Sequence, residues 1–175
     1  MIGTLGRRLR LRSSLFSVGL IAVALAAALS GCAVQGGEAC TISGTASFTP
    51  GLTTTAKAVS YTFSGTFTGC HSVGGDSTIK SGTVTASGSG SNLACTGGNS
   101  SGTATVNWNN GQSSTINITT SGALNAVVVT GKVVAGEFAG ASDHAVLAFT
   151  VANPTACNTA GGVTSASFKG ESTPK

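Results

Sequence analysis

Apolar residues alternate with threonine, serine or another polar residue through most of the chain beyond residue 40. A clear example is the run Ala145, Leu147, Phe149 and Val151, in which every second side chain is apolar. Successive side chains of a β-strand point to opposite faces, so a period of two indicates strands with one buried face. No segment beyond residue 32 combines a helical apolar stripe with helix-capping residues. The pattern therefore predicts an all-β fold.

Turn residues separate these alternating runs. Asn109-Asn110-Gly111 lies between residues 103–108 and 113–119, and Asn-Gly favours the positive φ angles of a tight hairpin. The glycine-rich segment from Gly88 to Gly102 is predicted to be a long loop that carries Cys95. Together with further turns, this pattern gives about eight strands. The further turns lie at Pro50-Gly51, Gly74-Gly75-Asp76, Ser121-Gly122, residues 140–143 and Asn153-Pro154.

Short strands at this spacing predict an antiparallel β-sandwich, immunoglobulin-like or jelly-roll in type. An up-and-down β-barrel is the alternative, because its strands show the same alternation. We expect a single domain over residues 40–171 and a tail at residues 172–175.

The first 31 residues have the composition of an export signal. All four arginines, Arg7, Arg8, Arg10 and Arg12, precede an uncharged apolar stretch at residues 15–29. This stretch is shorter than the roughly 20 residues of a permanent membrane helix, so we predict a cleaved signal peptide over residues 1–31. The chain beyond it has five lysines and five acidic residues, and its formal net charge is zero. No arginine remains there to bind phosphates, and nucleic acid is not an expected partner.

The end of the apolar stretch, Leu29-Ser30-Gly31-Cys32, resembles the lipobox of bacterial lipoproteins. The resemblance implies cleavage before Cys32, a lipid on its thiol and a short tether over residues 32–39. The protein would then lie at the outer face of the cytoplasmic membrane, with the membrane as its partner through Cys32. The alternative is an ordinary signal peptide, which would release a secreted protein.

The number of cysteines fits this interpretation. An odd set of five is unusual for an exported protein, but a lipid on Cys32 leaves four for disulfides: Cys40, Cys70, Cys95 and Cys157. They include no Cys-x-x-Cys pair, so no zinc site and no cofactor is predicted. If successive strands run up and down, Cys40 meets Cys70 at one end of the domain, and Cys95 meets Cys157 at the other.

Residues that could carry chemistry are few. His71 and His144 are the only histidines, and Asp143 precedes His144 directly, so in a strand their side chains would point to opposite faces. We therefore predict no catalytic residues. The candidate ligand contacts are Trp108, the loop residues Glu137 and Phe138, and the pair Asp143 and His144. The parity that Trp108 shares with Val106 favours burial, and Phe138 is expected to plug one end of the domain.

Three segments resemble small secreted β-proteins of high-GC Gram-positive bacteria: Thr103 to Thr119, which contains Val106 to Gly111, then Gly136-Glu137-Phe138-Ala139-Gly140, and Cys157 to Val163. The resemblance implies an exported, disulfide-bonded β-domain and implies no activity. The leading hypothesis is a non-enzymatic lipoprotein that binds an envelope polymer or protein, or supports the envelope structurally. The alternatives are a barrel that carries an apolar ligand and a cell-wall polymer hydrolase that uses His71 or His144.

Overall fold

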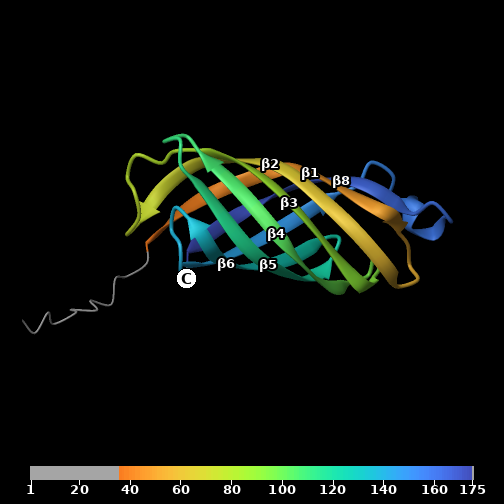
Figure 1. The fold of residues 1–175 in the computed structure, drawn as a ribbon. Coiled ribbons are helices and arrows are strands. Elements are labelled where there is room, and N and C mark those ends of the chain that lie inside the picture. Colours follow the sequence, from red (N-terminus) through yellow and green to blue (C-terminus); the bar gives the residue numbers. More distant parts are fainter. Residues whose placement is uncertain (1–35, 175) are drawn as a thin grey trace, which may run out of the picture. The chain divides into compact units, whose positions relative to one another are not determined.

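The alternating runs form the strands of one closed antiparallel β-barrel, in the order in which they occur along the chain (Figure 1). The computed structural model describes residues 36–174, so the predicted signal peptide and Cys32 lie outside the described residues. No helix within residues 36–174 has the length and apolar character needed to cross a membrane. The strands are β1 (Gly37–Leu52), β2 (Lys57–Val73), β3 (Gly82–Leu93), β4 (Gly98–Trp108), β5 (Ser113–Ala123), β6 (Ala126–Gly136), β7 (Ser142–Thr150) and β8 (Val163–Pro174), with a short 3-10 helix, η1 (Pro154–Asn158), before β8.

Pairing between the first and last strands decides the fold class. β1 pairs with β8 from Cys40–Ser172 to Ser47–Ser165, and this ladder closes the sheet on itself. The sandwich expected from the sequence is therefore wrong, whereas the barrel alternative fits. A strand of either fold has one buried face, so the alternation of apolar residues could not distinguish them.

The glycine-rich segment from Gly88 to Gly102 is not a long loop, in contrast to the prediction. β3 runs to Leu93 and β4 begins at Gly98, so that only residues 94–97 form the turn. Gly88 and Gly102 face each other across the two strands, and a Cβ atom on them would lie 2.3 and 2.8 Å from the Tyr61 Oη atom. These glycines leave room for the Tyr61 ring inside the barrel.

Side chains fill the interior of the barrel, as expected for eight strands. The ring of Phe168 lies 5.6 Å from those of Phe63 and Phe149, measured between centroids, and Phe48 extends the cluster. All four neighbouring pairs among these rings are tilted, which is a favourable arrangement for aromatic rings.

The barrel has two ends, and both chain termini of the described region lie at the same one (Figure 1). We call this the terminal end, because β1 begins there at Gly37 and β8 finishes there at Pro174. The strands thus include residues 37–39 and 172–174, which the sequence assigned to the tether and the tail. Three connections also lie at the terminal end: residues 74–81, 109–112 and 137–141.

A disulfide is present at each end of the barrel. Cys40 on β1 is bonded to Cys70 on β2 near the terminal end, and both residues are buried. At the far end, Cys95 in the turn after β3 is bonded to Cys157 in η1. These are the pairs that strand direction predicts. Two disulfides suit an oxidising compartment.

Substitution of Gly88 by alanine tests the packing of Tyr61. The added methyl group would overlap the Tyr61 ring and the Ser101 carbonyl oxygen, which lies 2.3 Å from the Cβ position. We expect Gly88→Ala to lower the free energy of unfolding by about 1–3 kcal/mol, as overpacking does. Gly161→Ala is the control, because nothing lies within 4 Å of its Cβ position. Urea unfolding measures both, and equal stability of the two variants would contradict the proposed packing.

Candidate functional site

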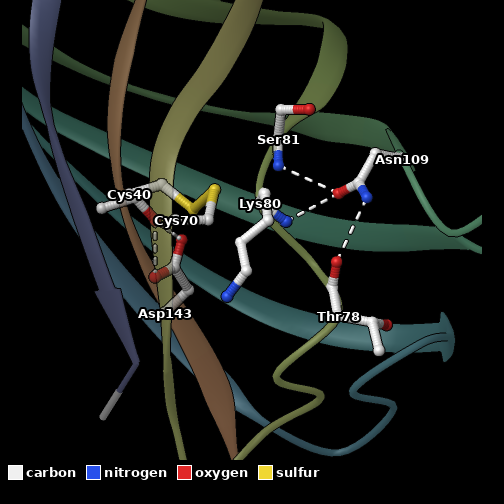
Figure 2. Close-up of a disulfide and its surroundings, with 8 residues drawn as sticks. Cys40, Cys70, Thr78, Lys80, Ser81, Asn109 and Asp143 are labelled. Carbon is white, nitrogen blue, oxygen red and sulfur yellow. Dashed lines mark hydrogen bonds between the residues drawn. A yellow bond between two sulfur atoms is a disulfide. The ribbon is translucent and has the colours of Figure 1, made fainter.

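Asn109 and Asn110, in the turn between β4 and β5, hold the connection at residues 74–81 over the terminal end. The Asn109 Oδ1 atom accepts hydrogen bonds from the backbone N–H groups of Lys80 and Ser81, at 2.7 and 3.0 Å, and its Nδ2 atom donates to the Thr78 carbonyl (Figure 2). Asn110 donates to the Asp76 carboxylate. The predicted Asn-Asn-Gly turn thus also positions the neighbouring loop, whose Ile79 side chain is fully buried.

The connection at residues 137–141 carries Phe138 in a strained backbone conformation. Phe138 has a φ of 61°, and Gly136 and Gly140 on either side have φ of 82° and 90°. A phenylalanine adopts positive φ rarely, and such residues occur often at functional sites. Its ring lies edge-on to Trp108, with the centroids 5.7 Å apart.

A short hydrogen-bond chain connects this loop to Trp108. The indole N–H of Trp108 donates to the Ser114 hydroxyl at 2.8 Å, and that hydroxyl donates to the Glu137 carbonyl at 2.7 Å. Ser114 is 1% exposed, so water is excluded from both bonds. The chain fixes the indole ring and the start of the Phe138 loop relative to each other.

These elements enclose a cavity of about 40 Å³, which we call the end pocket. Trp108, Phe138 and Phe67 supply its aromatic walls, and Glu38 and Asp143 supply two carboxyl groups. Trp108 stacks on Phe67 with a centroid distance of 5.5 Å. The pocket is thus mostly apolar, with two titratable groups at its wall. Its remaining lining residues include Val106, Ser114, Ile116, Val133, Ala141 and Ser172.

Glu38 is buried without any hydrogen-bond partner. Its side chain is 6% exposed, and neither Oε1 nor Oε2 accepts a hydrogen bond. Burial raises the pKa of its carboxyl group, and nearby Asp76 and Glu137 raise it further. Lys80 and His71 act in the opposite direction, because their positive charge favours the ionised form.

Asp143 is the second carboxyl group of the pocket, and it is hydrogen-bonded. The Ser172 hydroxyl donates to it, with the Oγ atom 2.8 Å from Oδ2 and 2.9 Å from Oδ1. Burial raises the pKa of Asp143, whereas the Ser172 hydrogen bond lowers it. Ser172 itself is 5% exposed. Asp143 and Ser172 thus satisfy each other across β7 and β8.

Three of the five predicted ligand contacts meet in the end pocket: Trp108, Phe138 and Asp143. Glu137 contributes its backbone carbonyl through Ser114, and its side chain does not line the pocket. His144 follows Asp143 on β7 and is half-buried outside the pocket.

Sequence reasoning missed Glu38 and Ser172, because it placed them in the tether and the tail. The alternation itself could have found them. Glu38 has the parity of Cys40 and Ile42, and Ser172 has the parity of Ala166 and Phe168. Both side chains are therefore directed inward with the core residues of their strands.

The two histidines are far apart in the sheet order. His71 is exposed on β2 and His144 lies on β7, with β1 and β8 between these strands. Within residues 36–174, no hydrogen bond joins either imidazole to a carboxylate, and no group of three or more potential metal ligands occurs.

A second cavity, of about 60 Å³, lies in the barrel interior next to the end pocket. We call it the central cavity. It shares five residues with the end pocket, and these form a common wall: Phe67, Val106, Ile116, Asp143 and Ser172. Its other walls are apolar and include Ile42, Val84, Ala104, Ile118, Leu147 and Phe168.

Comparisons of the chain with models of known protein families, with curated proteins and with solved structures find no match.

The raised pKa of Glu38 predicts how stability depends on pH. A carboxyl group whose pKa is higher in the folded state than in the unfolded state opposes folding at neutral pH, and this opposition disappears as the pH falls below the ordinary glutamate range, about 4.3. We expect Glu38→Gln to melt at a higher temperature than the wild type at pH 7.5, and the difference to narrow on acidification.

Thermal unfolding from pH 7.5 to pH 4 measures this effect. Asp143 titrates in both proteins, so its contribution cancels in the difference. Glu171→Gln on β8 is the control, since Glu171 is exposed and its replacement should leave the melting temperature nearly unchanged at every pH. A difference that widens as the pH falls would contradict the prediction for Glu38.

Proposed function

We propose that the chain is an exported lipoprotein whose barrel is a non-enzymatic binding module, with the end pocket as its binding site. The signal sequence and the lipobox-like Leu29-Ser30-Gly31-Cys32 support export and anchoring. The two disulfides agree with an oxidising location. The resemblance to small secreted proteins of Gram-positive bacteria points in the same direction.

The observation that carries the binding function is the unpaired Glu38 carboxyl group in a pocket with aromatic walls. A buried polar group without a partner costs about 1–3 kcal/mol, and more if it is charged. Asp143, in the same pocket, has a partner in Ser172, so the lack of one at Glu38 is not a general property of this end of the barrel. A bound ligand that pairs with Glu38 would offset the cost.

Lipidation would also place the end pocket near the membrane. Four residues separate Cys32 from the start of β1 at Gly37, and the five steps from Cys32 to Gly37 span at most about 3.6 Å each in an extended chain, or roughly 18 Å in total. The terminal end would then lie within this distance of the lipid. The module would bind ligands that are present at the outer membrane surface.

The second candidate function is an apolar-ligand carrier, which the closed barrel and its mostly apolar central cavity favour. The cavity measures about 60 Å³, whereas pockets for drug-sized ligands measure roughly 300–1,000 Å³. Carriage of a larger ligand would require Phe63 and Phe67 to move. We therefore rank this function below recognition at the end pocket.

Envelope polymers and proteins are candidate partners for the outer surface. An open groove of about 500 Å³ crosses β1 to β4 and presents hydroxyl groups of Thr45, Ser47, Thr62, Ser64, Thr85 and Thr103. Such a surface suits hydrogen bonding to a hydrated polymer.

A cell-wall hydrolase ranks last, because no histidine lines the end pocket or the central cavity among the described residues.

Replacement of Cys32 by alanine tests the anchoring. We expect Cys32→Ala to shift the protein from the membrane fraction to the medium, because it removes the thiol that would carry the lipid. Cell fractionation followed by immunoblotting measures the distribution. Retention of the variant in the membrane fraction, to the same extent as the wild type, would count against lipidation.

A substitution that fills the end pocket tests the proposed binding function. Ala141 lines the pocket and is 4% exposed, so Ala141→Leu should occupy much of its volume, whereas Ala135→Leu changes an exposed position on β6. We expect native mass spectrometry of protein released from the membrane to show a small-molecule adduct on the wild type and on Ala135→Leu. The adduct should be absent from Ala141→Leu. No adduct on any of the three would contradict a binding function at this pocket.

A further inference from the structure

We propose that the end pocket recognises an ammonium group, either of a small organic amine or of the exposed head of a larger molecule. This inference rests on the proposed binding function and names the class of ligand. It follows from three features of the pocket: its carboxyl groups, its aromatic walls and its volume.

The carboxyl groups make the pocket suitable for a positive charge. Glu38 offers two oxygens that accept no hydrogen bond in the structure, and Asp143 adds a second carboxyl group to the wall. An ammonium group has N–H donors for these acceptors and a charge of the opposite sign. The Lys80 amino group, which lowers the pKa of Glu38 from nearby, makes no hydrogen bond to it.

The aromatic walls favour an organic cation. Trp108, Phe138 and Phe67 line the same pocket, and aromatic rings attract cations through the negative potential of their faces. They also provide apolar surface for the carbon atoms next to an ammonium nitrogen. An inorganic cation would gain less from this environment.

The supply of oxygen ligands disfavours a metal ion. Calcium takes 6–8 oxygen ligands, and magnesium requires an octahedral set. The hydroxyl groups of Ser114 and Ser172 already hydrogen-bond to Glu137 and Asp143, respectively. The two carboxyl groups alone leave a metal ion poorly coordinated.

The volume limits what can enter. One water molecule requires a cavity volume of about 10–15 Å³. A pocket of about 40 Å³ therefore holds a group of a few heavy atoms. An ammonium group with one or two carbon atoms is of this size. A longer ligand would leave its remaining atoms outside the barrel.

Two loops, at residues 74–81 and 137–141, meet beside Glu38. A Cβ atom on Gly75 would lie 2.9 Å from the Glu38 Oε1 atom and 2.9 Å from the Phe138 ring. The glycine thus allows the connection at residues 74–81 to approach both groups closely. Because Phe138 is held at positive φ between two glycines, its loop is the element that we expect to open for the ligand.

Trp108 provides a direct measurement, because it is the only tryptophan of the chain and lines the pocket. Ethylammonium chloride is the probe, ethanol is its uncharged analogue, and sodium chloride controls for ionic strength. We expect ethylammonium to change the Trp108 fluorescence of the wild type with saturation at millimolar concentrations, about the strongest binding available to a ligand of three heavy atoms. Ethanol should bind at least ten-fold more weakly, and sodium should give no saturable change.

Two variants locate the interaction. Glu38→Gln should weaken ethylammonium binding at least ten-fold and raise the melting temperature, a combination that a merely structural role would not produce. Glu171→Gln removes an exposed carboxylate from β8 and should bind as the wild type does. Ethylammonium should also raise the melting temperature of the wild type. The comparison of ethylammonium with ethanol uses the wild type alone, so it tests the ammonium assignment even if Glu38→Gln does not fold.

Equal responses to ethylammonium and ethanol, a saturable response to sodium, or undiminished binding by Glu38→Gln would overturn the ammonium assignment. Failure of this assignment is distinct from failure of the proposed function. An adduct that Ala141→Leu abolishes, together with no preference for ethylammonium, would retain the binding pocket and reject only the ligand class. If no adduct forms and ethylammonium is not preferred over ethanol, both the binding function and the ammonium assignment are rejected.

Vesicles distinguish the two sources of an ammonium group. Phosphatidylethanolamine presents a primary ammonium at a membrane surface, and phosphatidylglycerol does not. A Trp108 response to phosphatidylethanolamine vesicles assigns a lipid headgroup, and a response to free ethylammonium alone assigns a soluble amine; either supports the proposal. A response to neither amine overturns it.

Discussion

Hydrogen bonding between β1 and β8 is the constraint on which the rest of the structure depends. It leaves no free sheet edge and determines which residues of the first and last strands face the interior. Ser172 pairs with Cys40 at the terminal end of this ladder, and Glu38 lies two residues before Cys40 on β1, where it pairs with Ser72 of β2. The same closure gathers three connections and both termini of the described region around one opening, where the end pocket forms.

Closure of the barrel also leaves little room for large side chains, and glycines on the opposite strands provide that room. Eight strands enclose little space, and large aromatic rings fit only where the opposite wall is thin. Gly44 and Gly65 face each other across β1 and β2, and a Cβ atom on either would approach the Phe168 ring within 2.8 and 3.1 Å. Gly82 lies opposite Trp108 in the same way. Because glycine loses much conformational entropy on folding, the disulfides at the two ends are well suited to compensate by restricting the unfolded chain.

The sequence predicts those parts of the barrel that depend on local chemistry. Alternation identified the strands, Asn109-Asn110-Gly111 identified the hairpin, and up-and-down strand direction identified both disulfide pairs. Closure could not be predicted, because it is a contact between residues more than 100 positions apart and leaves no local signal. The strand character of Gly88 to Gly102 was missed for a related reason: glycine indicates a turn when it is considered alone, whereas Gly88 and Gly102 leave room for the ring of Tyr61. Within the site, Trp108, Phe138 and Asp143 were identified individually, whereas Glu38 was dismissed for its position near the start of the domain.

The two carboxyl groups of the end pocket differ in their chemistry: Glu38 is buried without a partner, and Asp143 is half-buried and hydrogen-bonded. Asp143 is paired with Ser172 between β7 and β8, so its hydrogen bond contributes to the alignment of these strands. Glu38 aligns nothing, since its oxygens contact no donor. A leucine or methionine there would remove the desolvation cost and continue the apolar pattern of Cys40 and Ile42. A group that lowers stability without shaping the fold is best explained by what it can bind. Glu38 lies in the same pocket as the only tryptophan and a strained phenylalanine, and its burial there is not explained by packing alone.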